Sequence, residues 1–155
     1  MGRSGNPARD GKTVADRLDR AYAAIPDAGC RGLCTDSCHS LAMTPAEQRR
    51  IRAATGIRLP LVHAGGPCGA LGEDGRCQAY RERPTLCRLW GSVDDPLMRC
   101  PYGCVPEGGL LDSDEGHRIL SEVQRIGGAP RKAADDGDLD PGMLIRLREK
   151  ARHAR

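Results

Sequence analysis

Eight cysteines are the residues of this chain with the most chemistry to offer, and all of them lie between positions 30 and 104. Thiolates are soft ligands that bind zinc and iron, and clustered cysteines are typical of a metal site. The spacing is a C-x3-C-x3-C opening, three separated positions and a closing C-x3-C pair. We predict that all eight are metal ligands: Cys30, Cys34, Cys38, Cys68, Cys77, Cys87, Cys100 and Cys104.

The identity of the metal stays open, because zinc and iron, including iron in an iron–sulfur cluster, both accept four thiolates. No C-x2-C pair occurs, which counts against an ordinary zinc ribbon. Eight thiols are enough for two four-thiolate centres, so one centre and two are both compatible with the sequence. His39 follows Cys38 directly and is a further candidate ligand, although a lone histidine beside a cysteine is more often incidental.

Arginines accompany the cysteines and could balance the negative charge of a thiolate centre. Their alternative role is that of ordinary surface residues. The five are Arg76, Arg81, Arg83, Arg88 and Arg99.

The composition explains why a metal would matter to this chain. Its 155 residues include 20 Gly, 11 Pro, one Trp and no Phe, so little large apolar surface is available for a core. A metal site can supply the missing stability. We therefore predict a small, mainly α fold, in which an irregular Gly/Pro-rich, metal-organised cysteine knot is flanked by short helices.

Three stretches have the apolar periodicity of amphipathic helices. The second has the clearest boundaries, because Thr44 and Glu47 form a T-x-x-E capping box, Pro45 suits the first helical position and Gly56 is a left-handed stop. The third follows a cap at Asp112 or Ser113. The predicted ranges are 14–25, 45–54 and 113–126.

The chain divides into four predicted segments. Between 57 and 104 it is rich in Gly, Pro and charge, which favours irregular loops over a sheet. The last segment is basic, and either a solvated helix face or a partner-binding face is compatible with it. The segments are a disordered leader (1–12), a cysteine-cluster metal-binding domain (13–126), a linker (127–140) and a basic C-terminal helix (141–155).

The stretch from Cys68 to Arg88, CGALGEDGRCQAYRERPTLCR, resembles the YkgJ-like cysteine-cluster family, a zinc- or iron-chelating domain. The resemblance covers about residues 28–110, but the opening departs from the family's C-x2-C-x2-C-C form. It implies ligand positions at Cys30, Cys34, Cys38, Cys68, Cys77 and Cys87, and supporting positions at Glu47, Tyr80, Arg83 and Pro84. The segment from Arg99 to Cys104 resembles an extension found in one branch of the family.

The leading functional hypothesis is a metal-binding protein rather than an enzyme, with the metal organising the fold and the protein storing, sensing or delivering it. An iron–sulfur redox protein or electron carrier is one alternative. A zinc-organised adaptor that binds protein or nucleic acid is another. The formal charge of +3, from 24 basic and 21 acidic residues, is too small and mixed to indicate a nucleic-acid surface.

We expect a cytoplasmic protein without a membrane partner. The start of the chain has no apolar run of signal-peptide length, and no later run approaches a membrane span. Cytoplasmic thiols are kept reduced, which favours metal ligation over disulfides. Four disulfides in an exported protein are the competing interpretation.

Overall fold

The structure is a computed structural model, and it describes residues 13–39, 41–61 and 65–128. The described residues form four α-helices and two short 3-10 turns, without a β-strand among them. The mainly α prediction is therefore confirmed for this part of the chain. The elements are α1 (Val14–Ala23), η1 (Thr35–Ser37), α2 (Pro45–Thr55), η2 (Tyr80–Glu82), α3 (Thr85–Leu89) and α4 (Ser113–Gly127).

The three longer helices match the three predicted from periodicity. The capping box of α2 is present, because the Glu47 amide donates to Thr44 Oγ1 at 3.2 Å while Glu47 Oε2 accepts from the Thr44 amide at 2.8 Å. Gly56 ends α2 in the left-handed conformation with φ of 75°. Asp112 caps α4 by accepting from the Asp114 amide at 2.8 Å. The predicted leader and C-terminal helix, and the linker from residue 129 onward, lie outside the described residues.

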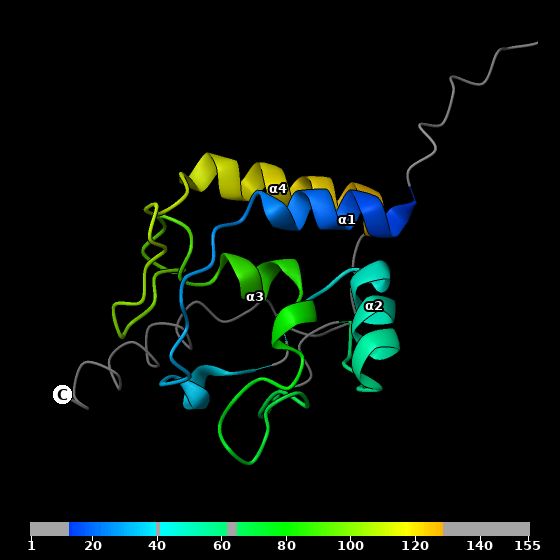
Figure 1. The fold of residues 1–155 in the computed structure, drawn as a ribbon, viewed down its shortest axis with the longest axis horizontal. Coiled ribbons are helices and arrows are strands. Elements are labelled where there is room, and N and C mark those ends of the chain that lie inside the picture. The colour runs from blue at the N-terminus through cyan, green and yellow to red at the C-terminus, as the bar shows by residue number, and fades with distance from the viewer. Residues whose placement is uncertain (1–12, 40, 62–64, 129–155) are drawn as a thin grey trace, which may run out of the picture.

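Helices α1 and α4 run side by side at the top of Figure 1, with α2 and α3 below them. A small apolar cluster joins α1, α2 and α4, and Gly127 brings the end of α4 onto the start of α2. A Cβ atom at Gly127 would overlap the Thr44 hydroxyl, so only glycine permits this approach. The cluster consists of Leu18, Ala21, Tyr22, Ala46, Val123 and Ile126.

Two further small apolar clusters join helices to the loops. One surrounds Ile51 and Leu59 and has Cys68 and Cys77 packed against it. The other joins Leu89 to Ile119 of α4. The apolar interior is thus divided among three small groups. In the described ranges, no helix is long and apolar enough to cross a membrane.

One helix lies in the segment that we predicted to be irregular. Pro84 precedes the first residue of α3 with extended dihedral angles, and the Arg88 amide donates to its carbonyl at 3.0 Å. The helix ends at Trp90, whose amide donates to the Leu86 carbonyl at 3.2 Å. The described residues of 57–104 form no β-strand, as the preference for loops over a sheet predicts, but the short helix α3 was not foreseen.

Candidate metal centre

The cysteine-rich opening forms a loop rather than a continuous helix. Cys30 and Cys34 lie in irregular backbone, and only the turn η1 separates Cys34 from Cys38. Gly29 and Gly32 have φ of 61° and 69°, a left-handed conformation that side chains with a Cβ rarely adopt. The two glycines therefore let the opening reverse direction around its first cysteine.

Backbone hydrogen bonds bring distant cysteines together. The Cys68 amide donates to the Cys38 carbonyl at 2.9 Å, which ties the opening loop to a segment thirty residues later. The Gln78 amide donates to the Ala70 carbonyl at 2.8 Å, and this turn returns Cys77 towards Cys68. Helix α3 carries Cys87. The sulfur atoms thus come from four places in the sequence without a sheet to hold them.

Four thiols lie close enough for their charges to interact, and we call them the four-thiol cluster: Cys38, Cys68, Cys77 and Cys87. Burial and the neighbouring thiols raise the pKa of Cys87 to about 12. The hydrogen bond with Cys68, followed by burial, raises the pKa of Cys38. Burial also raises the pKa of Cys77. Without a cation, Cys38, Cys77 and Cys87 are therefore thiols at neutral pH.

Amide groups point at several of the sulfur atoms from two residues further along the chain. The Gly32 amide donates to Cys30 Sγ at 3.4 Å, and the Ala70 amide donates to Cys68 Sγ at 3.5 Å. The Ala79 amide makes the same type of bond to Cys77 and acts to lower its pKa. Hydrogen bonds to sulfur favour the thiolate, which is the form that ligates metals.

A cavity of ≈ 370 Å³ opens beside the cluster. Four cysteines line it, so it is a thiol-lined space, and Thr35 and Tyr80 complete part of its wall. Ligand pockets in proteins span about 300 to 1,000 Å³, and a single water occupies about 30 Å³. The cavity therefore has room for more than one ion. The lining cysteines are Cys30, Cys34, Cys38 and Cys77.

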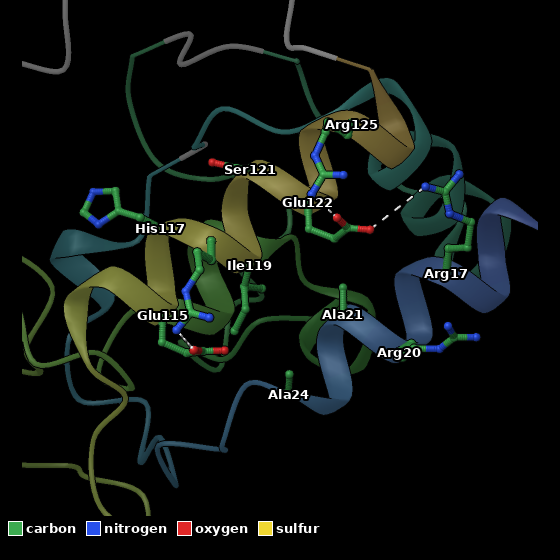
Figure 2. Close-up of a pocket in the computed structure, with 11 residues that line it drawn as sticks. Arg17, Arg20, Ala21, Ala24, Glu115, His117, Ile119, Ser121, Glu122 and Arg125 are labelled. Atoms are coloured by element: carbon green, nitrogen blue, oxygen red, sulfur yellow. Dashed lines mark hydrogen bonds and ion pairs between the residues drawn. The ribbon is translucent and has the colours of Figure 1, made fainter.

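A larger cavity of ≈ 600 Å³ lies elsewhere, in a groove between α1 and α4. Figure 2 shows that charged side chains line it, with Arg17 and Arg125 both directed at Glu122. Cysteine does not occur among its lining residues. We therefore place the candidate metal chemistry in the smaller, thiol-lined cavity and not in this groove.

Arg83 is the arginine that fits a thiolate centre. Its side chain is buried, with 9% of the residue exposed, and in the described part of the chain its Nε is the only buried side-chain nitrogen or oxygen without a hydrogen-bond partner. Its positive charge acts to lower the pKa of both Cys77 and Cys87. An anionic metal–thiolate group would supply the acceptor that this buried Nε–H donor lacks.

The other four arginines near the cysteines have different surroundings. Arg88 lies 4.0 Å from the centre of the Tyr22 ring and donates to the Arg83 carbonyl at 2.8 Å, so it is a structural residue. Arg99 pairs with Asp94 on the surface. Arg76 lines the thiol cavity but is exposed, as is Arg81.

Cys100 and Cys104 stand apart and form what we call the outer thiol pair. A turn, in which the Gly103 amide donates to the Cys100 carbonyl at 3.2 Å, brings them together. Burial acts to raise the pKa of Cys104, but hydrogen bonds from Arg31 outweigh it and lower that pKa. Arg31 also donates to the Tyr102 carbonyl at 2.7 Å. Sequence reasoning missed Arg31, and nothing in the local pattern marks it.

The histidine candidates fall outside the four-thiol cluster or outside the described residues. His39 Nδ1 lies 2.6 Å from the Gly66 carbonyl oxygen, so this nitrogen carries the proton and donates. Only Nε2 of His39 is then left to ligate a metal. His117 makes a similar contact within α4, at 2.8 Å from the Ser113 carbonyl. His63 and His153 are not among the described residues.

None of the eight cysteines forms a disulfide, so the competing framework of four disulfides is not what the structure contains. At the same time, within residues 13–39, 41–61 and 65–128, no three His, Cys, Asp or Glu side chains are already arranged to hold one metal ion. The thiols are gathered but not yet at coordination distances. A knot organised by metal is therefore not confirmed.

Glu47 holds in place the helix that carries Cys87. Its Oε1 accepts from Tyr22 Oη at 3.0 Å, from the Thr85 amide at 2.7 Å and from Thr85 Oγ1 at 2.6 Å. These bonds fix the start of α3, which carries Cys87, against α1 and α2. The family resemblance marked Glu47 as supporting, but it did not reveal Tyr22 or Thr85 as partners.

A small helical scaffold that gathers free thiols in irregular loops defines a cysteine-cluster domain. Residues 29–105 match the model of the CxxCxxCC family, described as "Putative zinc- or iron-chelating domain", so the chain is similar to that family over this region. The recognition made from the motif is therefore confirmed. Searches among curated proteins and solved structures found no match to the chain.

Proposed function

We propose that this protein binds zinc or iron through the four-thiol cluster and that the bound metal completes the folding of the loop region. The observation that carries the proposal is that four thiols from separate parts of the chain lie close enough for neighbouring thiols to raise the pKa values of Cys38, Cys77 and Cys87. The chelating family whose model residues 29–105 match supports the same chemistry.

The raised pKa values give the physical reason for binding. Clustered, buried thiols stay protonated because charging several of them in one small volume is unfavourable. A bound cation would supply positive charge and replace the protons, so metal binding and folding would share free energy. Amide donors to Cys30, Cys68 and Cys77 are already placed to stabilise the thiolate forms.

An iron–sulfur centre is the second candidate, and the volume of the thiol cavity favours it over a single ion. The cavity of ≈ 370 Å³ adjoins Cys38 and Cys77 of the cluster and also meets Cys30 and Cys34. A polynuclear centre uses four cysteine ligands. These ligands could come from the four-thiol cluster or from the four cysteines that line the cavity. Such a centre would make the protein a redox protein or electron carrier.

Cys100 and Cys104 stay predicted ligands, and one centre and two both stay open; the pair lies in its own turn beside Arg31. The adaptor hypothesis depends on the basic helix predicted for 141–155, which the structure does not describe, and it also stays a prediction. We propose a reducing compartment such as the cytoplasm, since eight free thiols persist only where disulfides are kept reduced.

Purification without oxygen, followed by quantification of zinc and iron, tests the proposal. We expect a stoichiometric metal, with a visible absorption band that bleaches with dithionite if the centre is iron–sulfur. The Cys87→Ser variant should lose most of that metal. The matched control is Arg20→Gln, an exposed residue of α1, which should keep it. A well-folded parent protein without zinc or iron would rule the proposal out.

A further inference from the structure

The buried Arg83 guanidinium has one side occupied by protein groups. Its Cζ lies 4.0 Å from the centre of the Tyr80 ring, and Nη2 lies 3.6 Å from Asp27 Oδ1. Tyr80 Oη donates to the same carboxylate oxygen at 3.0 Å. Asp27, which is exposed, thus holds both the ring and the guanidinium in place. Arg83 is oriented from this side, although no bond on it reaches Nε.

Arg83 lies in the chain between two members of the four-thiol cluster, Cys77 and Cys87. Its charge acts on Cys77 and on Cys87, which belong to two different segments. Nε is buried and unsatisfied among the described residues. A buried guanidinium is retained in proteins when an anion pairs with it; the exposed Asp27 pairs with Nη2 at 3.6 Å but leaves Nε without a partner among the described residues.

We propose that Arg83 is the built-in counter-charge of the metal centre, with Nε–H donating to a thiolate sulfur of Cys77 or Cys87 when metal is bound. This inference rests on the proposed function. Arg83 would be a positioning residue, because it acts through the ligands and does not itself coordinate the metal. It thereby sets how firmly the thiolates resist protonation and, in an iron–sulfur centre, the reduction potential.

The charge balance explains why one buried arginine suffices. Four thiolates around a divalent cation carry a net charge of −2, and a guanidinium in contact halves it. Hydrogen bonds to sulfur and nearby positive charge both stabilise the more negative state of a metal–thiolate group. The remaining arginines near the cysteines are either exposed or engaged with Tyr22 and with backbone carbonyls, so they cannot replace Arg83.

The test compares Arg83→Met, which keeps the length of the side chain without its charge, with Arg83→Lys, which keeps the charge without Nε. Arg81→Gln is the matched control, because Arg81 is exposed in the same short turn. Each protein is purified without oxygen, its zinc and iron are quantified, and the pH at which half the metal is released is measured with a chelator present.

We expect Arg83→Met to release its metal at a pH higher by about half a unit or more, because its thiolates take up protons more readily. Arg83→Lys should fall between Arg83→Met and the parent, and Arg81→Gln should match the parent. In an iron–sulfur form, the reduction potential of Arg83→Met should also be lower. A purely structural role would move neither the release pH nor the potential.

Three outcomes separate this inference from the proposal on which it rests. A parent protein without metal overturns the proposed function itself. A metal-loaded parent whose release pH equals that of Arg83→Met overturns only the role of Arg83. If Arg83→Met does not fold, the comparison of Arg83→Lys with the parent decides, and an identical release pH for those two proteins likewise overturns the role of Nε.

Discussion

Two buried polar regions of this protein differ in how completely the chain itself satisfies them. Around Glu47, both carboxylate oxygens accept hydrogen bonds, three at Oε1 and two at Oε2. Around the four-thiol cluster, the pKa values of Cys38, Cys77 and Cys87 are raised and Arg83 Nε has no partner. The first region is complete with protein atoms alone. In our proposal, the second would become equally complete when a bound cation converts the thiols to thiolates that can accept from Arg83 Nε.

The contrast indicates that the two regions are stabilised in different ways. Glu47 joins α1, α2 and α3 whether or not a metal is bound, so the helical layer can form first. The loops that carry the cysteines would then be arranged but incompletely stabilised until metal arrives. Substitutions in the two regions should therefore differ in how metal removal alters their effect on stability, and the predictions below test that difference.

The largest effect is expected for Cys87→Ala. This variant should lose stoichiometric metal and unfold more easily by several kcal/mol, a substantial part of the roughly 10 kcal/mol that a structural zinc site contributes. Thermal unfolding of the metal-loaded parent and variant measures it, with Arg20→Gln as the control. Without metal, the gap between parent and variant should nearly close, and a gap of the same size in both states would contradict the contrast.

Glu47→Gln should destabilise the protein by about 2 to 4 kcal/mol, because an amide NH2 then faces buried donors that have no other acceptor. The loss should be similar with and without metal, as measured by chemical unfolding. Glu82→Gln is the control, since Glu82 pairs with Arg50 at a partly exposed position and should lose less. If metal removal changed the cost of Glu47→Gln severalfold, the helical layer would not be independent of the centre.

Gly127→Ala should cost about 1 to 3 kcal/mol through overpacking, because the added methyl group would overlap the Thr44 side chain. The effect again belongs to the helical layer and should not depend on metal. Gly108→Ala provides the control, since a methyl group there meets open space. Equal melting temperatures for these two variants would show that α4 can move away from α2 at little cost.

The smallest effect is the pH dependence of the metal-free protein. The folded pKa of Cys87 is raised to about 12, above its ordinary value in the unfolded chain of about 8.5. The stability that this thiol contributes is therefore fully present below about pH 8.5 and is lost as the pH rises towards 12. We expect a decrease of about 1 kcal/mol for each pH unit within that window.

Chemical unfolding in the presence of a chelator measures this pH dependence, and Cys87→Ser should flatten it because serine does not titrate there. Metal affinity should show the opposite trend and strengthen as the pH rises, since ligation releases protons. A metal-free parent whose stability is constant from pH 8.5 to 10 would argue against a buried thiol at this position.

Local signals in the sequence were enough to predict the longer helices. The capping box of Thr44 and Glu47, the stop at Gly56 and the cap at Asp112 all depend on residues a few positions apart, and each is present. Short-range rules did not reveal α3, because five residues after a proline carry little periodicity. Its position is fixed by Glu47, which lies 38 residues before Thr85.

The candidate site was only partly accessible to sequence reasoning. Residue type and the family resemblance identified the cysteines and Arg83, but they could not sort eight thiols into groups. That sorting follows from long-range contacts such as the Cys68 amide to the Cys38 carbonyl and Arg31 to the Tyr102 carbonyl. Hydrogen bonds of this kind leave no pattern in a single sequence, because any residue can provide the backbone groups.

Trp90 gives the protein an intrinsic optical reporter. Its amide donates to the Leu86 carbonyl, which places it at the end of α3. The chain has a single tryptophan, so indole fluorescence excited at long wavelength comes from one place only. That place is the end of the short helix that carries Cys87. Emission from Trp90 should therefore report changes around Cys87 during titration with zinc or iron, without any attached dye.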